Sequence, residues 1–142
     1  MQEIYKLQEE FSKNANIKFA DYQQMYAQSV SNPDAFWGKA ANRLTWAKNF
    51  TKVKNSSFAS NVDIKWFEDG KLNVAANCID RHLAKRANQT AIIWEGDNPE
   101  ESKTITYNQL YAEVCKLTHA FIKLGIKQGD RVTIYMPMVP EA

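Results

Sequence analysis

The sequence has little glycine, little cysteine and almost no excess of charge, and each shortage excludes a class of protein. Its five glycines are scattered, so neither Gly-x-x-x-x-Gly-Lys-Ser/Thr nor Gly-x-Gly-x-x-Gly, the loops that cradle phosphates, is present. A net charge of +2 is too small to neutralise a row of nucleic-acid phosphates. Two cysteines, Cys78 and Cys115, make no disulfide framework, so we expect reduced thiols.

Long hydrophobic runs are missing as well. No run approaches the roughly 20 apolar residues that cross a bilayer, and the first ten residues lack the apolar stretch of a signal peptide. What is present is 44% hydrophobic, 12% aromatic and 24% charged residues, which is typical of a globular protein with one substantial core. We therefore expect a cytoplasmic protein.

The first half of the chain has the pattern of aromatic-rich helices. Residues 1–18 are polar, and we expect a mobile lead-in in which Ile4, Leu7 and Phe11 do not sustain a helical period. A helix with an apolar stripe follows, and a second begins at Asn32-Pro33-Asp34, where Asn can cap and Pro suits the first turn. The two apolar faces comprise Phe19, Tyr22, Tyr26 and Val30, then Phe36, Trp37, Ala40, Ala41 and Leu44.

The period then changes from helix to strand. Residues 62–67 alternate apolar and polar side chains, as a half-buried strand does, and Asp69-Gly70 is a turn signal. Asn73 can cap a helix that we expect to end near Asn88. The buried stripe predicted for this helix comprises Ala75, Cys78, Ile79, His82, Leu83 and Arg86.

The last third predicts an α/β unit. Residues 90–95 and 103–107 have strand patterns, and Thr106 with Gln109 makes a capping box for a helix that Gly125 ends. The apolar seam of this helix comprises Leu110, Val114, Leu117, Phe121 and Leu124. With a further strand at residues 131–136, the order fits a right-handed crossover. Pro140-Glu141 resembles a helix start, so we expect the polypeptide to continue past Ala142.

Four candidate constellations could carry chemistry. Cys78 with His82 and Cys115 with His119 are i, i+4 pairs that could together bind zinc, but packed thiols and hydrogen-bonded histidines are the favoured interpretation. The other three constellations are the tryptophans Trp37, Trp46, Trp66 and Trp94, the pair Asp80-Arg81 beside His82, and the turn Trp94-Glu95-Gly96-Asp97.

For each of these three, packing or local pairing explains the residues better than chemistry. Core packing is favoured over base stacking for the tryptophans. For Asp80 and Arg81, opposite sides of the helix surface with a local partner for each are favoured over proton transfer. For the last segment, a polar turn is favoured over cation binding. The residues themselves therefore predict no catalytic, cofactor-binding or metal-binding residue.

Several runs of residues, taken together, resemble the N-terminal portion of the AMP-forming acetyl-coenzyme A synthetases. The resemblance extends from Phe19 to Ala142 and keeps the order of every run. The runs are Asn32-Pro33-x-x-Phe36-Trp37, Ile64-x-Trp66-Phe67-x-Asp69-Gly70-x-Leu72-Asn73-Val74, Asn77-Cys78-Ile79-Asp80-Arg81-His82-Leu83, Ile92-Ile93-Trp94-Glu95-Gly96-Asp97 and Gly129-Asp130-Arg131-Val132-x-Ile134-Tyr135-Met136-Pro137-Met138-x-Pro140-Glu141-Ala142.

The resemblance implies a fold, an activity and a division of the chain. The fold class is α/β, with an aromatic-rich helical segment leading into the first strands and crossover helix of a larger domain. Residues 1–18 would be the lead-in, 19–89 the family's N-terminal helical and hairpin region, and 90–142 the start of the large AMP-binding domain. Magnesium-bound ATP and acetate would give acetyl-adenylate, from which coenzyme A takes the acetyl group. The partners would be the rest of that domain and a mobile C-terminal domain.

The family's catalytic, coenzyme A and metal residues all correspond to positions beyond residue 142, so none is assigned here. We expect residues 1–142 to be scaffold, inactive in isolation and without a bound cofactor. An unfinished sheet could let this piece self-associate. A propionyl- or acetoacetyl-coenzyme A synthetase is the alternative within the superfamily, and a non-catalytic interaction module is the alternative outside it.

Overall fold

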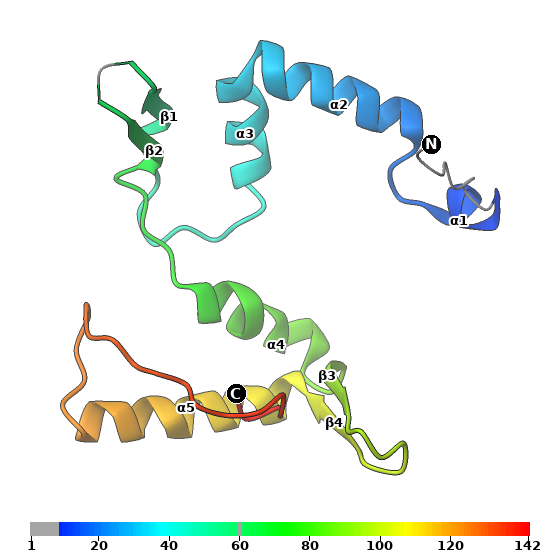
Figure 1. Ribbon diagram of the computed structural model, residues 1–142, viewed down its shortest axis with the longest axis vertical. Helices are drawn as coiled ribbons and strands as arrows, with labels where there is room; N and C mark the ends of the chain where they lie inside the picture. The colour runs from blue at the N-terminus through cyan, green and yellow to red at the C-terminus, as the bar shows by residue number, and fades with distance from the viewer. Residues whose placement is uncertain (1–8, 60) are drawn as a thin grey trace, which may run out of the picture. The chain divides into compact units, whose positions relative to one another are not determined.

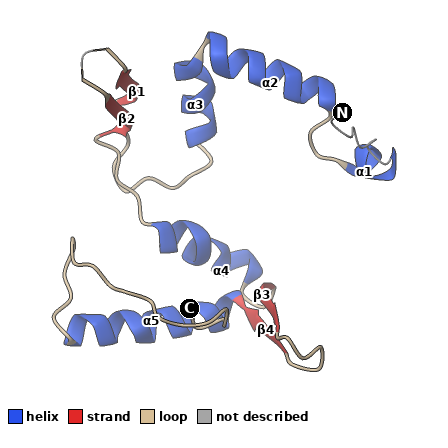
Figure 2. Ribbon diagram, in the orientation of Figure 1, coloured by secondary structure: helices blue, strands red, loops and turns tan. Residues whose placement is uncertain are grey.

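The computed structural model describes residues 9–59 and 61–142, which form two units (Figure 1). The first unit ends at Leu72 and the second is Asn73–Ala142. Helices and short antiparallel strand pairs alternate along the chain (Figure 2), so the predicted α/β class is confirmed. Ile4 and Leu7 of the expected lead-in lie outside the described residues.

Three helices open the first unit: α1 (Glu9–Asn14), α2 (Phe19–Ser31) and α3 (Pro33–Ala41). The helix α1 occupies part of the polar segment for which no helix was predicted. As predicted, Asn32 caps α3, because its Oδ1 accepts a hydrogen bond from the Ala35 N–H at 3.3 Å. The two helices on either side of Asn32 therefore follow from local sequence signals.

An antiparallel hairpin completes this unit. The strand β2 (Asp63–Glu68) lies where the alternation predicts it, and it pairs with β1 (Lys52–Ser57), which was not predicted. The sequence Lys-Val-Lys-Asn-Ser-Ser of β1 has a single apolar residue, so it carries no strand period. The chain leaves β2 through a turn in which Asp69 has a φ of 62° and the Gly70 N–H donates to the Phe67 carbonyl at 3.0 Å.

Aromatic side chains pack beside this turn. The rings of Trp46, Phe50 and Phe67 lie 5.1–5.6 Å apart, centroid to centroid, and we call these three the Trp46 cluster. The indole N–H of Trp46 donates to the Ala41 carbonyl at 3.0 Å, which ties the cluster to the end of α3. Ala41, the last residue of α3, is itself buried, at 4% exposure.

The second unit begins with a helical segment of unexpected geometry. Asn73 caps it as predicted, since its Oδ1 accepts from the Ala76 N–H at 3.0 Å. The segment then runs through a π-helical stretch, η1 (Ala76–Asp80), into α4 (Arg81–Arg86).

The apolar stripe predicted for this segment is only partly buried in the structure. A π turn is wider than an α turn and rotates the faces that follow it. Ile79 is buried as predicted, at 8% exposure, whereas Ala75, which precedes the π-helical stretch, and Cys78 and Arg86 are exposed. The prediction that these three are buried is wrong.

The hairpin and the helix that follow agree best with the prediction from the sequence. The strand β3 (Thr90–Glu95) pairs antiparallel with β4 (Ser102–Thr106), and α5 (Tyr107–Lys123) begins directly after it. The capping box is present: Thr106 Oγ1 accepts from the Gln109 N–H at 3.3 Å, and Gln109 Oε1 accepts from the Thr106 N–H at 2.9 Å. Gly125, with a φ of 80°, follows the end of α5.

The strand predicted at residues 131–136 is absent. This segment has no strand assignment, and the described residues contain no strand after α5. The sheet that contains β3 has two strands only, so the strand–helix–strand crossover is not formed either. Strand formation needs a neighbouring strand to accept the backbone hydrogen bonds, and none is supplied to this segment.

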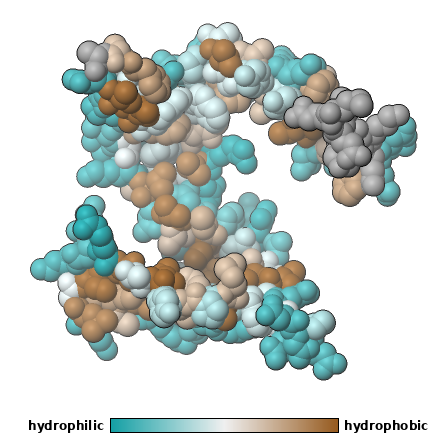
Figure 3. Space-filling model, viewed as in Figure 1, coloured by the Kyte–Doolittle hydropathy of each residue, from teal (hydrophilic) through white to brown (hydrophobic). Residues whose placement is uncertain are grey.

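Large apolar side chains remain exposed in both units (Figure 3). In the described part of the chain, Ala41 and Ile79 are the buried apolar residues, so the substantial core expected from composition is not formed. Leu117 and Leu124 of the α5 seam are exposed, at 51% and 77%. The apolar seam predicted for α5 is thus only partly covered, with Leu110, Val114 and Phe121 half-buried and Leu117 and Leu124 open to solvent.

Candidate functional site: an apolar groove at the first two helices

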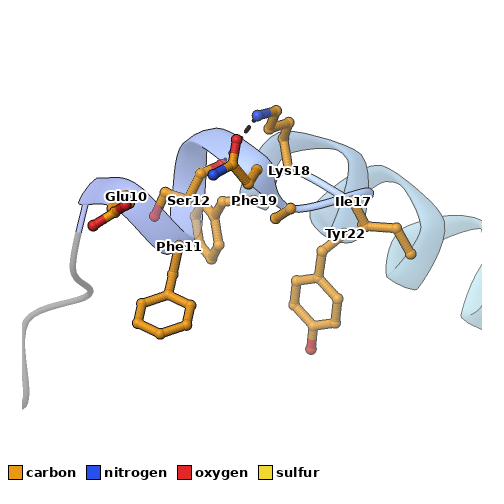
Figure 4. A pocket seen from close by; sticks show the side chains of 9 residues that line it. Glu10, Phe11, Ser12, Ile17, Lys18, Phe19 and Tyr22 are labelled. Atoms are coloured by element: carbon orange, nitrogen blue, oxygen red, sulfur yellow. Dashed lines mark hydrogen bonds between the residues drawn. The ribbon is translucent and has the colours of Figure 1, made fainter.

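A concavity of the first unit lies where α1 turns into α2. It has a volume of about 980 Å³ and is lined mainly by Phe11, Ile17, Phe19 and Tyr22. Figure 4 shows the rings of Phe11 and Tyr22 projecting to the same side of the two helices. We call this the α1–α2 groove. Its apolar lining suits it for binding a hydrophobic surface.

Lys18 and Asp21 make hydrogen bonds that hold the chain between α1 and α2. Lys18 Nζ donates to the carbonyls of Ser12 and Lys13, at 3.0 and 2.7 Å, so the cation stabilises the C-terminal end of α1. The backbone N–H of Lys18 donates to Asp21 Oδ2 at 3.0 Å. The ionisable residues among those that line the groove are Glu10, Lys18 and Tyr22.

The residues considered for zinc do not form a metal site in the described part of the chain, where no group of three or more potential ligands occurs. Cys78 is exposed, so its expected role as a packed thiol is wrong, while Cys115 is half-buried. A side-chain hydrogen bond with Cys115 raises the pKa of Tyr111. The ring of His82 lies 5.4 Å from that of Tyr107.

The other constellations are explained by local contacts. Arg81 Nη1 donates to Asn77 Oδ1 at 3.0 Å, one helical turn away. Trp46 belongs to the Trp46 cluster, and the rings of Trp37 and Trp66 meet edge to face at 6.2 Å. The segment around Gly96 is a hairpin loop, because the Gly96 N–H donates to the Glu101 carbonyl at 2.7 Å.

Trp94 takes part in an arrangement that sequence reasoning missed. The indole N–H of Trp94 donates to the Met138 carbonyl at 2.8 Å, and Lys103 Nζ forms an ion pair with Glu141 Oε1 at 2.7 Å. Trp94 and Lys103 lie opposite each other on β3 and β4, so one cross-strand pair holds the C-terminal segment at two points. We call this the Trp94–Lys103 clasp. No short-range signal predicts it, because its partners are distant in sequence.

Comparison with known proteins identifies the chain. Residues 79–142 match the family described as AMP-binding enzyme, and residues 22–78 match the acetyl-coenzyme A synthetase N-terminus. The chain therefore belongs to the AMP-binding enzymes. Within them it belongs to the acetyl-coenzyme A synthetase family, as the resemblance predicted.

Curated relatives agree with this assignment. The chain is 59% identical over 139 residues to an acetyl-coenzyme A synthetase of Mesorhizobium japonicum and 58% identical over 140 residues to one of Methylocella silvestris. A third, from Bradyrhizobium diazoefficiens, is 56% identical over 142 residues. These matches cover 98–99% of this chain but only 21–22% of each relative. The chain thus spans about a fifth of the length of the relatives that it matches.

Proposed function

We propose that this chain is the N-terminal region of an AMP-forming acetate–CoA ligase. The reaction would join acetate to ATP, releasing pyrophosphate, and coenzyme A would then displace AMP from the acetyl-adenylate. The observation that carries the proposal is a pair of adjoining family matches. Residues 22–78 match the acetyl-coenzyme A synthetase N-terminus, and residues 79–142, which follow directly, match the AMP-binding enzymes.

The proposed role of residues 1–142 in that reaction is scaffolding. The sequence has no glycine-rich loop to cradle ATP phosphates. The described residues contain no cluster of three or more carboxylate, histidine or cysteine side chains to hold Mg²⁺. The described residues therefore do not form a binding site for ATP phosphates or Mg²⁺. ATP, Mg²⁺ and coenzyme A would be bound by later parts of the enzyme.

The scaffold role can be tested with a chimera. Residues 1–142 would replace the matching first fifth of the Mesorhizobium japonicum enzyme, and acetate-dependent pyrophosphate release would be measured. We expect activity close to that of the unmodified recipient, and none from residues 1–142 alone. A folded but inactive chimera would contradict the family role, and turnover by residues 1–142 alone would contradict the scaffold assignment.

The acyl substrate needs a separate experiment, because the acyl pocket would lie in the recipient's part of the chimera. The complete reading frame that contains this sequence should be expressed and assayed with acetate, propionate and acetoacetate. We expect the highest kcat/KM with acetate. A preference for propionate or acetoacetate would replace acetate in the proposal without changing the family. Fractionation of the source cells would test the cytoplasmic location that we propose.

A further inference from the structure

The turn after β2 contains the only aspartate–glycine pair of the sequence, Asp69-Gly70. Such a pair can convert to isoaspartate, because glycine has no Cβ to shield its backbone nitrogen. The Gly70 nitrogen bonds to Cγ of the Asp69 carboxylic acid, and the hydroxyl of the acid leaves with the amide proton as water. Water then opens the resulting succinimide ring at either carbonyl. The products are aspartate and isoaspartate, whose backbone runs through Cγ.

Both reacting groups are occupied in the folded turn. The Gly70 N–H donates to the Phe67 carbonyl at 3.0 Å, and Asp69 Oδ2 accepts from Thr51 Oγ1 at 3.1 Å. The N–H of Thr51 also donates to the Glu68 carbonyl at 2.9 Å, which fixes Thr51 beside the turn. The bond to Cγ therefore requires that the carboxyl leave Thr51 and that the amide leave Phe67.

The closed turn is strained and depends on these contacts. Phe67 and Asp69 have φ values of 51° and 62°, in the left-handed region that side chains other than glycine rarely adopt. Such residues persist only where their surroundings hold them. On the far side of the turn, Lys71 and Lys48 exchange backbone hydrogen bonds of 2.9 and 3.1 Å. Loss of a contact with the turn should thus favour its local opening.

We propose that Asp69 is a modification site at which isoaspartate forms when the turn opens, and that the hydrogen bond from Thr51 limits the reaction in the folded chain. The modification also leaves the hairpin unable to close again with its native packing. The chemistry needs no co-reactant besides water. It does not depend on the proposed function.

The product does not fit the native turn because isoaspartate adds one carbon to the backbone directly before Gly70. The surroundings of Gly70 have no room for even one more carbon: a Cβ on this residue would lie 2.6 Å from Cζ3 of Trp46. The hydrogen bond from Gly70 to Phe67 would also have to span a longer loop. The Trp46 cluster should therefore be disrupted once the modification has occurred.

Prolonged incubation of the chain in neutral buffer tests the proposal. Peptide mass spectrometry with electron-transfer fragmentation distinguishes isoaspartate from aspartate at position 69. Thr51→Val removes the hydroxyl that holds Asp69, and we expect it to convert about fivefold faster than the unaltered chain, as the loss of one hydrogen bond implies. Thr51→Ser keeps the hydroxyl and should convert at close to the unaltered rate.

Two references separate protection by Thr51 from overall stability. In concentrated urea, the unaltered chain and both Thr51 variants should convert at one common rate, faster than any folded form. Thr106→Ala removes a hydroxyl hydrogen bond in the second unit and should convert at the unaltered rate. Equal rates for Thr51→Val and Thr51→Ser, acceleration by Thr106→Ala, or folded chain converting as fast as chain in urea would each overturn the proposal.

The effect on packing has its own readout. The indole N–H of Trp46 donates to the Ala41 carbonyl, so its NMR signal should shift and exchange faster in the isoaspartate form. The indole N–H of Trp94, in the second unit, should be unchanged. Asp69→Glu closes a six-membered ring far more slowly, so after the same incubation it should remain unmodified and keep its Trp46 signal. An isoaspartate form with a native Trp46 signal would overturn the proposed loss of packing.

Discussion

Gly70 shows how a single residue fits a tightly packed site. A Cβ at this position would lie 2.6 Å from Cζ3 of Trp46, 2.9 Å from the carbonyl oxygen of Phe67 and 3.2 Å from Cβ of Phe50. Two of these contacts are closer than side chains tolerate, and one of them is with backbone that cannot move away freely. The small residue is thus required by the Trp46 cluster, and not only by the turn that Asp69-Gly70 predicts.

We expect Gly70→Ala to lower the free energy of unfolding by about 1–3 kcal/mol, the usual cost of overpacking. Urea denaturation monitored by tryptophan fluorescence would measure it. Gly38→Ala is the matched control, since its Cβ would meet only Val53 at 3.4 Å. Within α3 that change should be neutral or stabilising by up to about 1 kcal/mol. Equal losses in both variants would contradict the packing argument.

The clasp makes a prediction for the titration of Glu141. Its hydrogen bond with Lys103 holds the pKa of the Glu141 carboxyl below the usual value. The ion pair therefore contributes stability above the pKa of the unfolded chain and loses it as pH falls through the folded-state pKa.

We expect Lys103→Met to raise the pKa of Glu141 towards that of a free glutamate, measured by NMR titration of its side-chain carboxyl. Lys116→Met, which removes the partner of Glu113 on α5, should leave Glu141 unchanged. An unchanged pKa in Lys103→Met would mean that the ion pair does not persist in solution.

At the scale of elements, helix starts were the most predictable feature of this chain. Asn32, Asn73 and Thr106 were each expected to cap a helix, and each accepts the hydrogen bond that defines the cap. Capping depends on residues within one turn of each other, so it can be predicted from short stretches of sequence.

The Thr106 cap can be tested on its own. We expect Thr106→Ala to lower the free energy of unfolding by about 1 kcal/mol, the typical value of an N-cap side chain. Thr106→Ser keeps the hydroxyl and should retain most of that stability, as judged by the midpoint of thermal unfolding. A loss of equal size in both variants would assign the effect to the γ-methyl group instead.

The elements that the sequence did not predict depend on partners that are distant or absent. The strand β1 forms because β2 pairs with it, although its own residues show no strand period. Residues 131–136 show that period and form no strand, because no neighbour accepts their hydrogen bonds. The π turn at Ala76–Asp80 displaces Cys78 from the predicted stripe. The α1–α2 groove could not be predicted from the sequence, because it depends on the hydrogen bonds from Lys18 Nζ to carbonyls of α1, which hold the segment between the two helices.

At the scale of the whole molecule, exposed apolar surface should govern behaviour in solution. Within the described residues, the backbone of 131–136 makes no hydrogen bond to other backbone groups, and Ile134 and Tyr135 are 64% and 99% exposed. The segment from Val132 to Pro140 carries no charge. An extended, uncharged stretch with these side chains is prone to pair with an identical stretch in another molecule.

We therefore expect residues 1–142 to associate as concentration rises, which analytical ultracentrifugation would detect. Ile134→Lys should weaken the association because it places charge within the pairing stretch. Leu124→Lys removes an exposed apolar side chain outside that stretch and should have little effect. Monomeric behaviour of the unaltered chain at high concentration would contradict the prediction.

The Trp94–Lys103 clasp also has a consequence for how related sequences vary. Trp94 binds the backbone carbonyl of residue 138, which every amino acid carries, whereas Lys103 binds the side chain of Glu141. Related sequences can therefore carry a different residue at position 138 and still keep the hydrogen bond from Trp94. A neutral residue at position 141, by contrast, should be found together with the loss of the cation at position 103.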